Sequence, residues 1–263
     1  MQQPQARPAR AMRPITAVAF AVVYMIIMAI GWIVDPYEYG TAGNLFYQTP
    51  FLVVALIYTY TLIRMYRVPV VRAGRLRAPW PLFAVIVIML IDAVGAVYSL
   101  APGFHGKWVT IPAMFVSTMI VGFAEEGMFR GLITTGLARR MSTGKALLIS
   151  SVLFGFLHAV NILAHAAPGA VAFQVIFTMF VGYALGTVYI RSGGSLLLVA
   201  LLHGFYDFFV FATSYGTASG GQTLMAISIV NLAAWFILSF VLLFRNRGRL
   251  PDLAAMRKDS EQV

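Results

Sequence analysis

Seven ionisable side chains lie inside long apolar stretches of this sequence. Placing such a group in lipid costs at least ~2.5 kcal/mol, so each one is a candidate for a functional role. The chain contains no Cys, which excludes thiolate nucleophiles and disulfides. The seven residues are Asp92, Glu125, Glu126, Arg130, His158, His203 and Asp207.

Carboxylates and imidazoles, without a Ser and His pair at suitable spacing, suit the activation of water better than a covalent nucleophile. A buried Glu can take a proton from water held jointly with a His and return it to a leaving amine. His203 and a neighbouring polar side chain could then donate hydrogen bonds to the oxyanion. In the alternative, Glu125, His158 and His203 hold a divalent metal such as Zn²⁺. Both routes predict hydrolysis.

The spacing of these residues limits which of them can act together. Glu126 and Arg130 are four residues apart and share a helix face, as do His203 and Asp207. Glu125 is rotated by about 100° from Glu126 on a helix. One carboxylate can therefore face a cavity while its neighbour pairs with Arg130.

The elements that must position these groups are membrane-spanning helices. The chain is 60% hydrophobic and 11% charged, whereas soluble domains carry roughly a quarter charged residues. An all-α, polytopic transmembrane helical bundle is therefore predicted as one membrane domain over residues 14–244, between a basic segment at 1–13 and a tail at 245–263. The eight expected spans are 14–34, 50–62 with its flanks, 80–100, 110–136, 146–163, 170–190, 195–215 and 224–244.

The distribution of Lys and Arg predicts the orientation of these spans. Because such residues collect on the cytoplasmic side, we expect eight crossings with both termini in the cytoplasm, in a bacterial plasma (inner) membrane. All but two of the 19 basic residues then lie on the cytoplasmic side; the exceptions are Lys107, in an external segment, and Arg130, inside a span. The net charge of +10 follows from this topology. With no soluble reader domain, nucleic acid is not an expected partner, and no oligomeric state is predicted.

Three of the polar residues are expected at a common depth. Glu126 precedes its nearest basic anchor, Arg139, by 13 residues, and His203 follows Arg191 by 12. His158 follows Lys145 by 13. At about 1.5 Å per helical residue, all three lie roughly 18 to 20 Å from the cytoplasmic boundary. Three helices thus deliver polar groups to one level.

Three short motifs on separate spans carry a resemblance to a known family. They read Glu125-Glu126-Gly-Met-Phe-Arg130, Phe154-Gly-Phe-Leu-His158 and His203-Gly-Phe-Tyr-Asp207. In this order and setting they resemble the CPBP family (CAAX protease and bacteriocin-processing, also called Abi or Rce1-like) of intramembrane proteases. The resemblance covers about residues 110–211.

The resemblance implies roles for the motif residues. Glu125 and His158 would activate the water, and Arg130 would position Glu126. His203 and residue 207 would stabilise the oxyanion, although the prenyl-protein proteases typically have Asn where this chain has Asp207. A carboxylate donates a hydrogen bond only when protonated, so this departure favours the bacterial branch of the family or ligation of a metal.

The sequence therefore favours an intramembrane endopeptidase that acts on a peptide or membrane-protein substrate within the lipid bilayer. A prenylated CAAX tail is one candidate substrate. Two alternatives stay open. The same buried Glu, His and Asp residues could form the relay of a proton-coupled transporter, for which inverted halves are expected and not found. The chain could also be an inert membrane scaffold.

Overall fold

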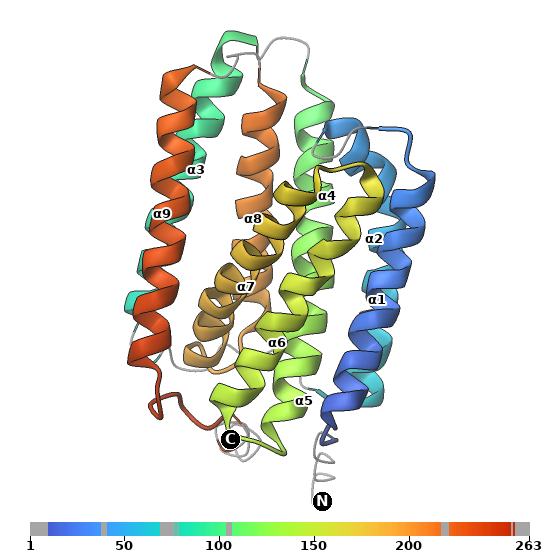
Figure 1. Cartoon of the computed structure of the whole chain (residues 1–263), viewed down its shortest axis with the longest axis vertical. Helices are drawn as coiled ribbons and strands as arrows, with labels where there is room; N and C mark the ends of the chain where they lie inside the picture. Colours follow the sequence, from blue (N-terminus) through green and yellow to red (C-terminus); the bar gives the residue numbers. More distant parts are fainter. Residues whose placement is uncertain are drawn as a thin grey trace, which may run out of the picture.

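The protein is a bundle of long helices that run roughly along one axis (Figure 1). This computed structural model describes residues 10–37, 41–68, 77, 79–103, 107–216, 221–253 and 255. Within those ranges the regular structure is helical, with no strand. The helices are α1 (Pro14–Val34), α2 (Ala42–Met65), α3 (Trp80–Leu100), η1 (Ala101–Gly103), α4 (Thr110–Glu126), η2 (Gly127–Thr134), α5 (Thr135–Ala138), α6 (Thr143–Leu157), η3 (His158–Ala164), α7 (Pro168–Arg191), α8 (Leu196–Tyr215) and α9 (Gln222–Arg245).

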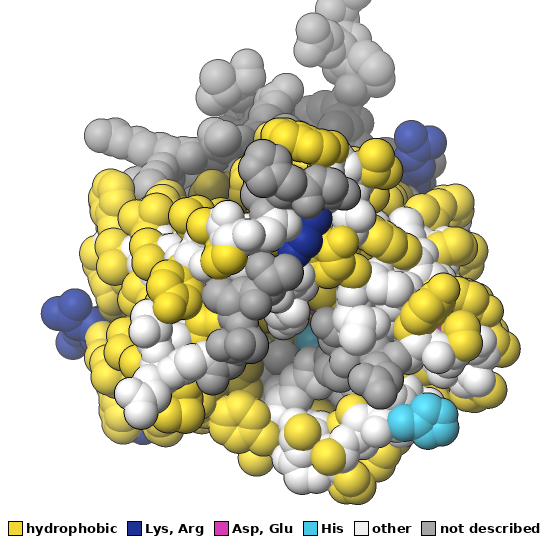
Figure 2. Space-filling model, turned by 90° about the horizontal axis from the view of Figure 1, so that it is seen from above, with side chains coloured by type: hydrophobic (Ala, Val, Ile, Leu, Met, Phe, Trp, Pro, Cys, Tyr) yellow, Lys and Arg dark blue, Asp and Glu magenta, His cyan; other side chains and the backbone are white. Residues whose placement is uncertain are grey.

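Seven helices in the described ranges are long and apolar enough to cross a membrane. The predicted span at 110–136 corresponds to α4, which continues through η2 into α5 and so extends from Thr110 to Ala138. Large apolar side chains of α1, such as Ile26, Ile30 and Ile33, are more than half exposed and face outward. Apolar side chains also surround the bundle in the view along its axis (Figure 2). The prediction of an all-α transmembrane bundle is confirmed.

Backbone hydrogen bonds gather the basic segments at one end of the bundle. Arg10 N donates to Tyr66 O after α2, and Met12 N donates to Gly136 O in α5. We call this the basic end; α1 begins there and α9 ends there (Figure 1). At the opposite end, Lys107 Nζ donates to Tyr215 O at the end of α8 (3.1 Å).

The beginning of α2 differs from the prediction. The apolar run suggested a start near Pro50, but the helix begins at Ala42, and the Thr41 hydroxyl accepts a hydrogen bond from Asn44 N (3.2 Å). Pro50 lies inside the helix, where it removes one backbone hydrogen bond without ending it. The two additional turns carry polar residues, which is why the hydrophobic pattern missed them.

Two of the motif-bearing spans change helix type beside their motif residues. The rod predicted as continuous over 110–136 becomes a π-helix directly after Glu126. The Ser150 hydroxyl and the Thr134 hydroxyl both donate to Phe129 O (2.6 and 2.8 Å), which satisfies this carbonyl within the π-helix. Similarly, α6 ends at Leu157 and continues as a 3₁₀ helix that begins at His158. Such irregular turns often occur at functional sites.

The α4 and α8 helices approach each other backbone to backbone. A Cβ added at Gly122 would overlap the Ala200 carbonyl oxygen and lie 2.8 Å from Gly204 N. Only glycine fits at this contact, as is common where membrane helices pack closely. Because Glu125 and Glu126 follow Gly122 by one turn, this contact brings the α4 carboxylates against the α8 motif.

Candidate active site

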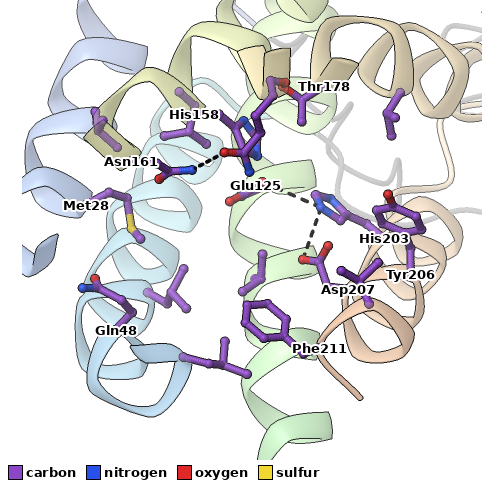
Figure 3. Close-up of a pocket in the computed structure, with 18 of the residues that line it drawn as sticks. Met28, Gln48, Glu125, His158, Asn161, Thr178, His203, Tyr206, Asp207 and Phe211 are labelled. Atoms are coloured by element: carbon purple, nitrogen blue, oxygen red, sulfur yellow. Dashed lines mark hydrogen bonds and ion pairs between the residues drawn. The ribbon is translucent and has the colours of Figure 1, made fainter. Parts of the chain in front are cut away.

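A cavity of about 300 Å³ lies among α1, α2, α4, α6, α7 and α8 (Figure 3). Four of the six predicted site residues line it, namely Glu125, His158, His203 and Asp207. The other two, Glu126 and Arg130, are completely buried behind the cavity wall. The structure thus brings the predicted residues of three separate spans to one cavity.

Glu126 joins two cationic or potentially cationic groups. Its Oε1 lies 3.0 Å from Arg130 Nη1, and the same oxygen accepts a hydrogen bond from His203 Nδ1 (2.9 Å). The pairing of Glu126 with Arg130 that the spacing predicted is therefore present. Since a carboxylate only accepts, its contact assigns a proton to His203 Nδ1 and turns Nε2 toward the cavity.

Arg130 is held on two further sides. Its Nη2 donates to Gly182 O on α7 (2.9 Å), and its guanidinium lies 4.3 Å from the centroid of the Phe154 ring. A Cβ added at Gly182 would lie 2.8 Å from Phe154 Cδ1 and 3.0 Å from Arg130 Nη2. The absence of a side chain at Gly182 therefore lets the guanidinium reach the α7 backbone.

Replacing Gly182 by Ala is expected to lower the free energy of unfolding by about 1–3 kcal/mol, because the new methyl group displaces packed side chains. The matched control is Gly169→Ala on the same helix, where nothing lies within 4 Å of the added Cβ. Thermal unfolding of the two purified variants in the same detergent measures the difference. Equal stability of both variants would contradict the described packing at Gly182.

His203 Nε2 faces two carboxylates. It lies 3.5 Å from Asp207 Oδ2 and 3.8 Å from Glu125 Oε2, the contacts drawn as dashed lines in Figure 3. Both neighbours are acceptors when ionised, so at least one proton must be shared among these three groups. A proton on Nε2 faces both carboxylates and makes His203 a donor at the cavity wall.

One of the two carboxylate oxygens of Glu125, Oε2, has no hydrogen-bond partner. Its side chain is 9% exposed, and Oε2 makes no hydrogen bond within the described structure. Leaving a buried acceptor unsatisfied costs about 1–3 kcal/mol, and more for a charged group. Glu125 lines the cavity, so its carboxylate is positioned to bind a molecule inside it.

His158 presents one defined ring nitrogen for chemistry. Its Nδ1 lies 3.1 Å from Phe154 O, and since a carbonyl only accepts, Nδ1 carries the proton. In the neutral ring Nε2 is then an acceptor. The Phe154 ring packs edge-on against both His158 and His203, with centroids 5.2 and 5.7 Å apart. Phe154 therefore fixes the two imidazoles relative to each other.

A metal centre formed by Glu125, His158 and His203 is the alternative that the sequence left open. Within the described residues, no group of three or more His, Asp or Glu side chains is arranged to hold a metal ion. The hydrogen bonds of His203 Nδ1 to Glu126 and of His158 Nδ1 to a backbone carbonyl leave Nε2 of each ring as the atom that would face a metal ion. As arranged, Glu125, His158 and His203 do not fit a three-ligand metal centre.

Several cavity residues were not identified from the sequence. Asn44 and Gln48 line the cavity from the unpredicted first turns of α2, and both donate to Asp35 Oδ2 (2.7 and 3.1 Å). Because they are four residues apart, Asn44 and Gln48 share one helix face, and this could have been predicted if the helix had been extended toward the N-terminus before Pro50. By contrast, Asp92 lies outside the cavity, where it accepts a hydrogen bond from Asn231 Nδ2 (2.7 Å) and links α3 to α9.

The fold and the site together define an integral membrane protein with a polar cavity of buried carboxylates and imidazoles inside a helical bundle. Residues 106–209 match the model of the family described as type II CAAX prenyl endopeptidase Rce1-like. This match confirms the predicted resemblance to the Rce1-like, CPBP family. At family level the match supports a CAAX-protease-like intramembrane endopeptidase, and the transporter and scaffold alternatives are not favoured. Comparisons with curated proteins and with solved structures gave no match.

Proposed function

We propose that this protein hydrolyses a peptide bond in the cavity, with Glu125 as the base that activates water. The observation that carries the proposal is the buried Oε2 of Glu125, which has no hydrogen-bond partner and lies 3.8 Å from His203 Nε2. A carboxylate in this position is free to accept a proton from water. The substrate would be a peptide or a membrane protein, and the site of action the bacterial plasma membrane.

The other groups of the site fit the remaining steps of hydrolysis. Water held between Glu125 and His158 Nε2 attacks the peptide carbonyl carbon, and its proton passes to Glu125. The oxygen of the tetrahedral intermediate takes a hydrogen bond from His203 Nε2. When the C–N bond breaks, Glu125 returns the proton to the leaving amine, so one water yields a new carboxyl group and a new amine.

Asp207 acts through His203 in this scheme. The family resemblance implied a direct contact between residue 207 and the oxyanion, which a carboxylate makes only when protonated. The 3.5 Å contact of Asp207 Oδ2 with His203 Nε2 instead supports a role in keeping His203 protonated. Glu126, held by Arg130, stabilises the same imidazole from its Nδ1 side.

The test of this function is cleavage of a quenched peptide library by the purified protein in proteoliposomes. We expect cleavage by the wild type, and none by His158→Ala, which keeps the Glu125 carboxylate but loses the second acceptor for water. Absence of cleavage by the wild type, or cleavage that survives in His158→Ala at the full rate, would contradict the proposal.

Treatment with a strong zinc chelator is expected to leave the cleavage rate within about twofold of the untreated rate, because the proposed base is a carboxylate rather than a metal-bound hydroxide. The measurement is the initial rate before and after chelation, with the melting temperature as a control for folding. Loss of activity that returns on addition of Zn²⁺ would favour the metal-dependent alternative.

A further inference from the structure

Most of the residues that line the cavity lie between Glu125 and one end of the bundle, whereas Phe154 lies one turn of α6 before His158. The residues toward that end include Met28 and Trp32 in the last turns of α1, Asn44 in the first turn of α2, and Ser214 in the last turn of α8. Each of these helix ends belongs to the end of the bundle opposite the basic end (Figure 1). Figure 2 looks onto this opposite end and shows a hollow at its centre, with a histidine recessed in it.

Between Glu126 and the basic end, the bundle is closed. The π-helix that follows Glu126 contributes Phe129, Leu132 and Ile133, all 0% exposed, and none of them lines the cavity. Arg130 is also fully buried there. The packed core of η2 therefore separates the cavity from the basic end.

The charges at the two ends of the bundle assign their sides of the membrane. Arg64, Arg140, Lys145 and Arg245 lie where helices meet the basic end, whereas Lys107 is the described basic residue at the other. Loops rich in Lys and Arg stay on the cytoplasmic side. The basic end is accordingly cytoplasmic, and the cavity opens away from the cytoplasm.

We propose that the cavity receives its substrate from the noncytoplasmic side of the membrane, as an extended juxtamembrane segment of a membrane-anchored protein. This inference rests on the proposed peptidase function. A tail that ends in the cytoplasm, such as a prenylated C-terminus, would have to cross the bilayer to reach Glu125. The substrate class is therefore defined by the position of the cleaved peptide bond, which lies on the noncytoplasmic side of the membrane.

The cavity walls fit such a segment. Leu52, Phe177, Val181 and Phe211 form apolar walls, while the catalytic groups lie at the closed end. A volume of about 300 Å³ is at the small end of ligand pockets and excludes a folded domain. An extended stretch of a few residues with apolar side chains, next to a membrane anchor, fits both the small volume and the apolar walls of the cavity.

The absence of native Cys makes the direction of the cavity directly measurable. Three single-cysteine variants are treated in intact expressing cells with a membrane-impermeant thiol reagent: Ser214→Cys at the mouth, Thr178→Cys inside the cavity, and Ser142→Cys at the basic end. Ser214 and Ser142 are exposed, whereas Thr178 is only 9% exposed and lines the cavity. We expect labelling of the first two from outside and of Ser142→Cys only after permeabilisation. Labelling of Thr178→Cys only after permeabilisation, or of Ser142→Cys from outside, would overturn the proposal.

A second measurement separates this inference from the proposed function. One cleavable sequence is placed either on the noncytoplasmic or on the cytoplasmic side of a single-span anchor, and both reporters are expressed with the wild-type enzyme. We expect at least tenfold more cleavage of the noncytoplasmic reporter; equal cleavage or a cytoplasmic preference overturns the inference. If the thiol labelling is as expected and neither reporter is cut, the proposed peptidase function fails while the sidedness of the cavity stands.

Discussion

Replacing Glu125 by Gln is expected to reduce kcat for peptide cleavage by about 10³-fold, within the range that general-base catalysis contributes. The amide is nearly the same size as the carboxylate, but it cannot accept a proton from water. Because Glu125 Oε2 has no hydrogen-bond partner in the described structure, the substitution breaks no such bond of that oxygen. The measurement is the single-turnover rate in proteoliposomes, with the melting temperature of each variant recorded beside it.

The matched control for this substitution is Asp92→Asn. Asp92 is also a carboxylate within the bundle, but it accepts a hydrogen bond from Asn231 of α9 and does not line the cavity. We expect its kcat to stay within about threefold of the wild-type value, far less than a general base contributes. If Glu125→Gln retained more than a tenth of the wild-type rate, or if both variants lost activity equally, Glu125 would not be the base.

Removing Glu126 alone is expected to destabilise the protein by about 3–5 kcal/mol, the usual cost of leaving a buried partner charge unpaired. In Glu126→Leu the guanidinium of Arg130 stays buried without its counterion. The double variant Glu126→Leu with Arg130→Met removes both charges, and most of the lost stability should return. Thermal and denaturant unfolding of the single and double variants in one detergent measures this cycle.

Catalysis should respond differently from stability in the same cycle. His203 Nδ1 loses its acceptor in both variants, so its ring is no longer fixed and its positive charge is no longer stabilised from that side. We therefore expect the double variant to fold but to cleave at least about 10²-fold more slowly, in line with the loss of an oxyanion donor. A double variant with wild-type activity would show that Glu126 does not position His203.

The meeting of the polar groups could be predicted because depth and helix face follow from counting residues. Glu126, His158 and His203 lie at similar distances from their basic anchors, and the structure brings all three to the cavity region. The choice between the adjacent carboxylates also follows from helix rotation: Glu126 pairs with Arg130, and Glu125 lines the cavity.

Other features depend on contacts between distant segments and could not be read from local patterns. The π-helix after Glu126 is stabilised partly by Ser150, which lies on a different helix. Phe154 contacts two imidazoles and a guanidinium only because α4, α6 and α8 meet there. The closed side of the cavity follows from the packing of η2, whose residues apart from Arg130 form part of a largely apolar run in the sequence.

In the proposed mechanism, Glu125, His158 and His203 act together on one substrate carbonyl within a single cavity. The most direct measurement is an experimental structure with a peptide whose scissile bond is replaced by a noncleavable hydroxyl-bearing isostere. We predict that this hydroxyl lies within hydrogen-bond distance of both Glu125 Oε2 and His203 Nε2. The rest of the bound peptide should extend out of the cavity at the end of the bundle opposite the basic end. A peptide bound elsewhere, or an isostere hydroxyl more than 10 Å from the Glu125 carboxylate, would contradict the account.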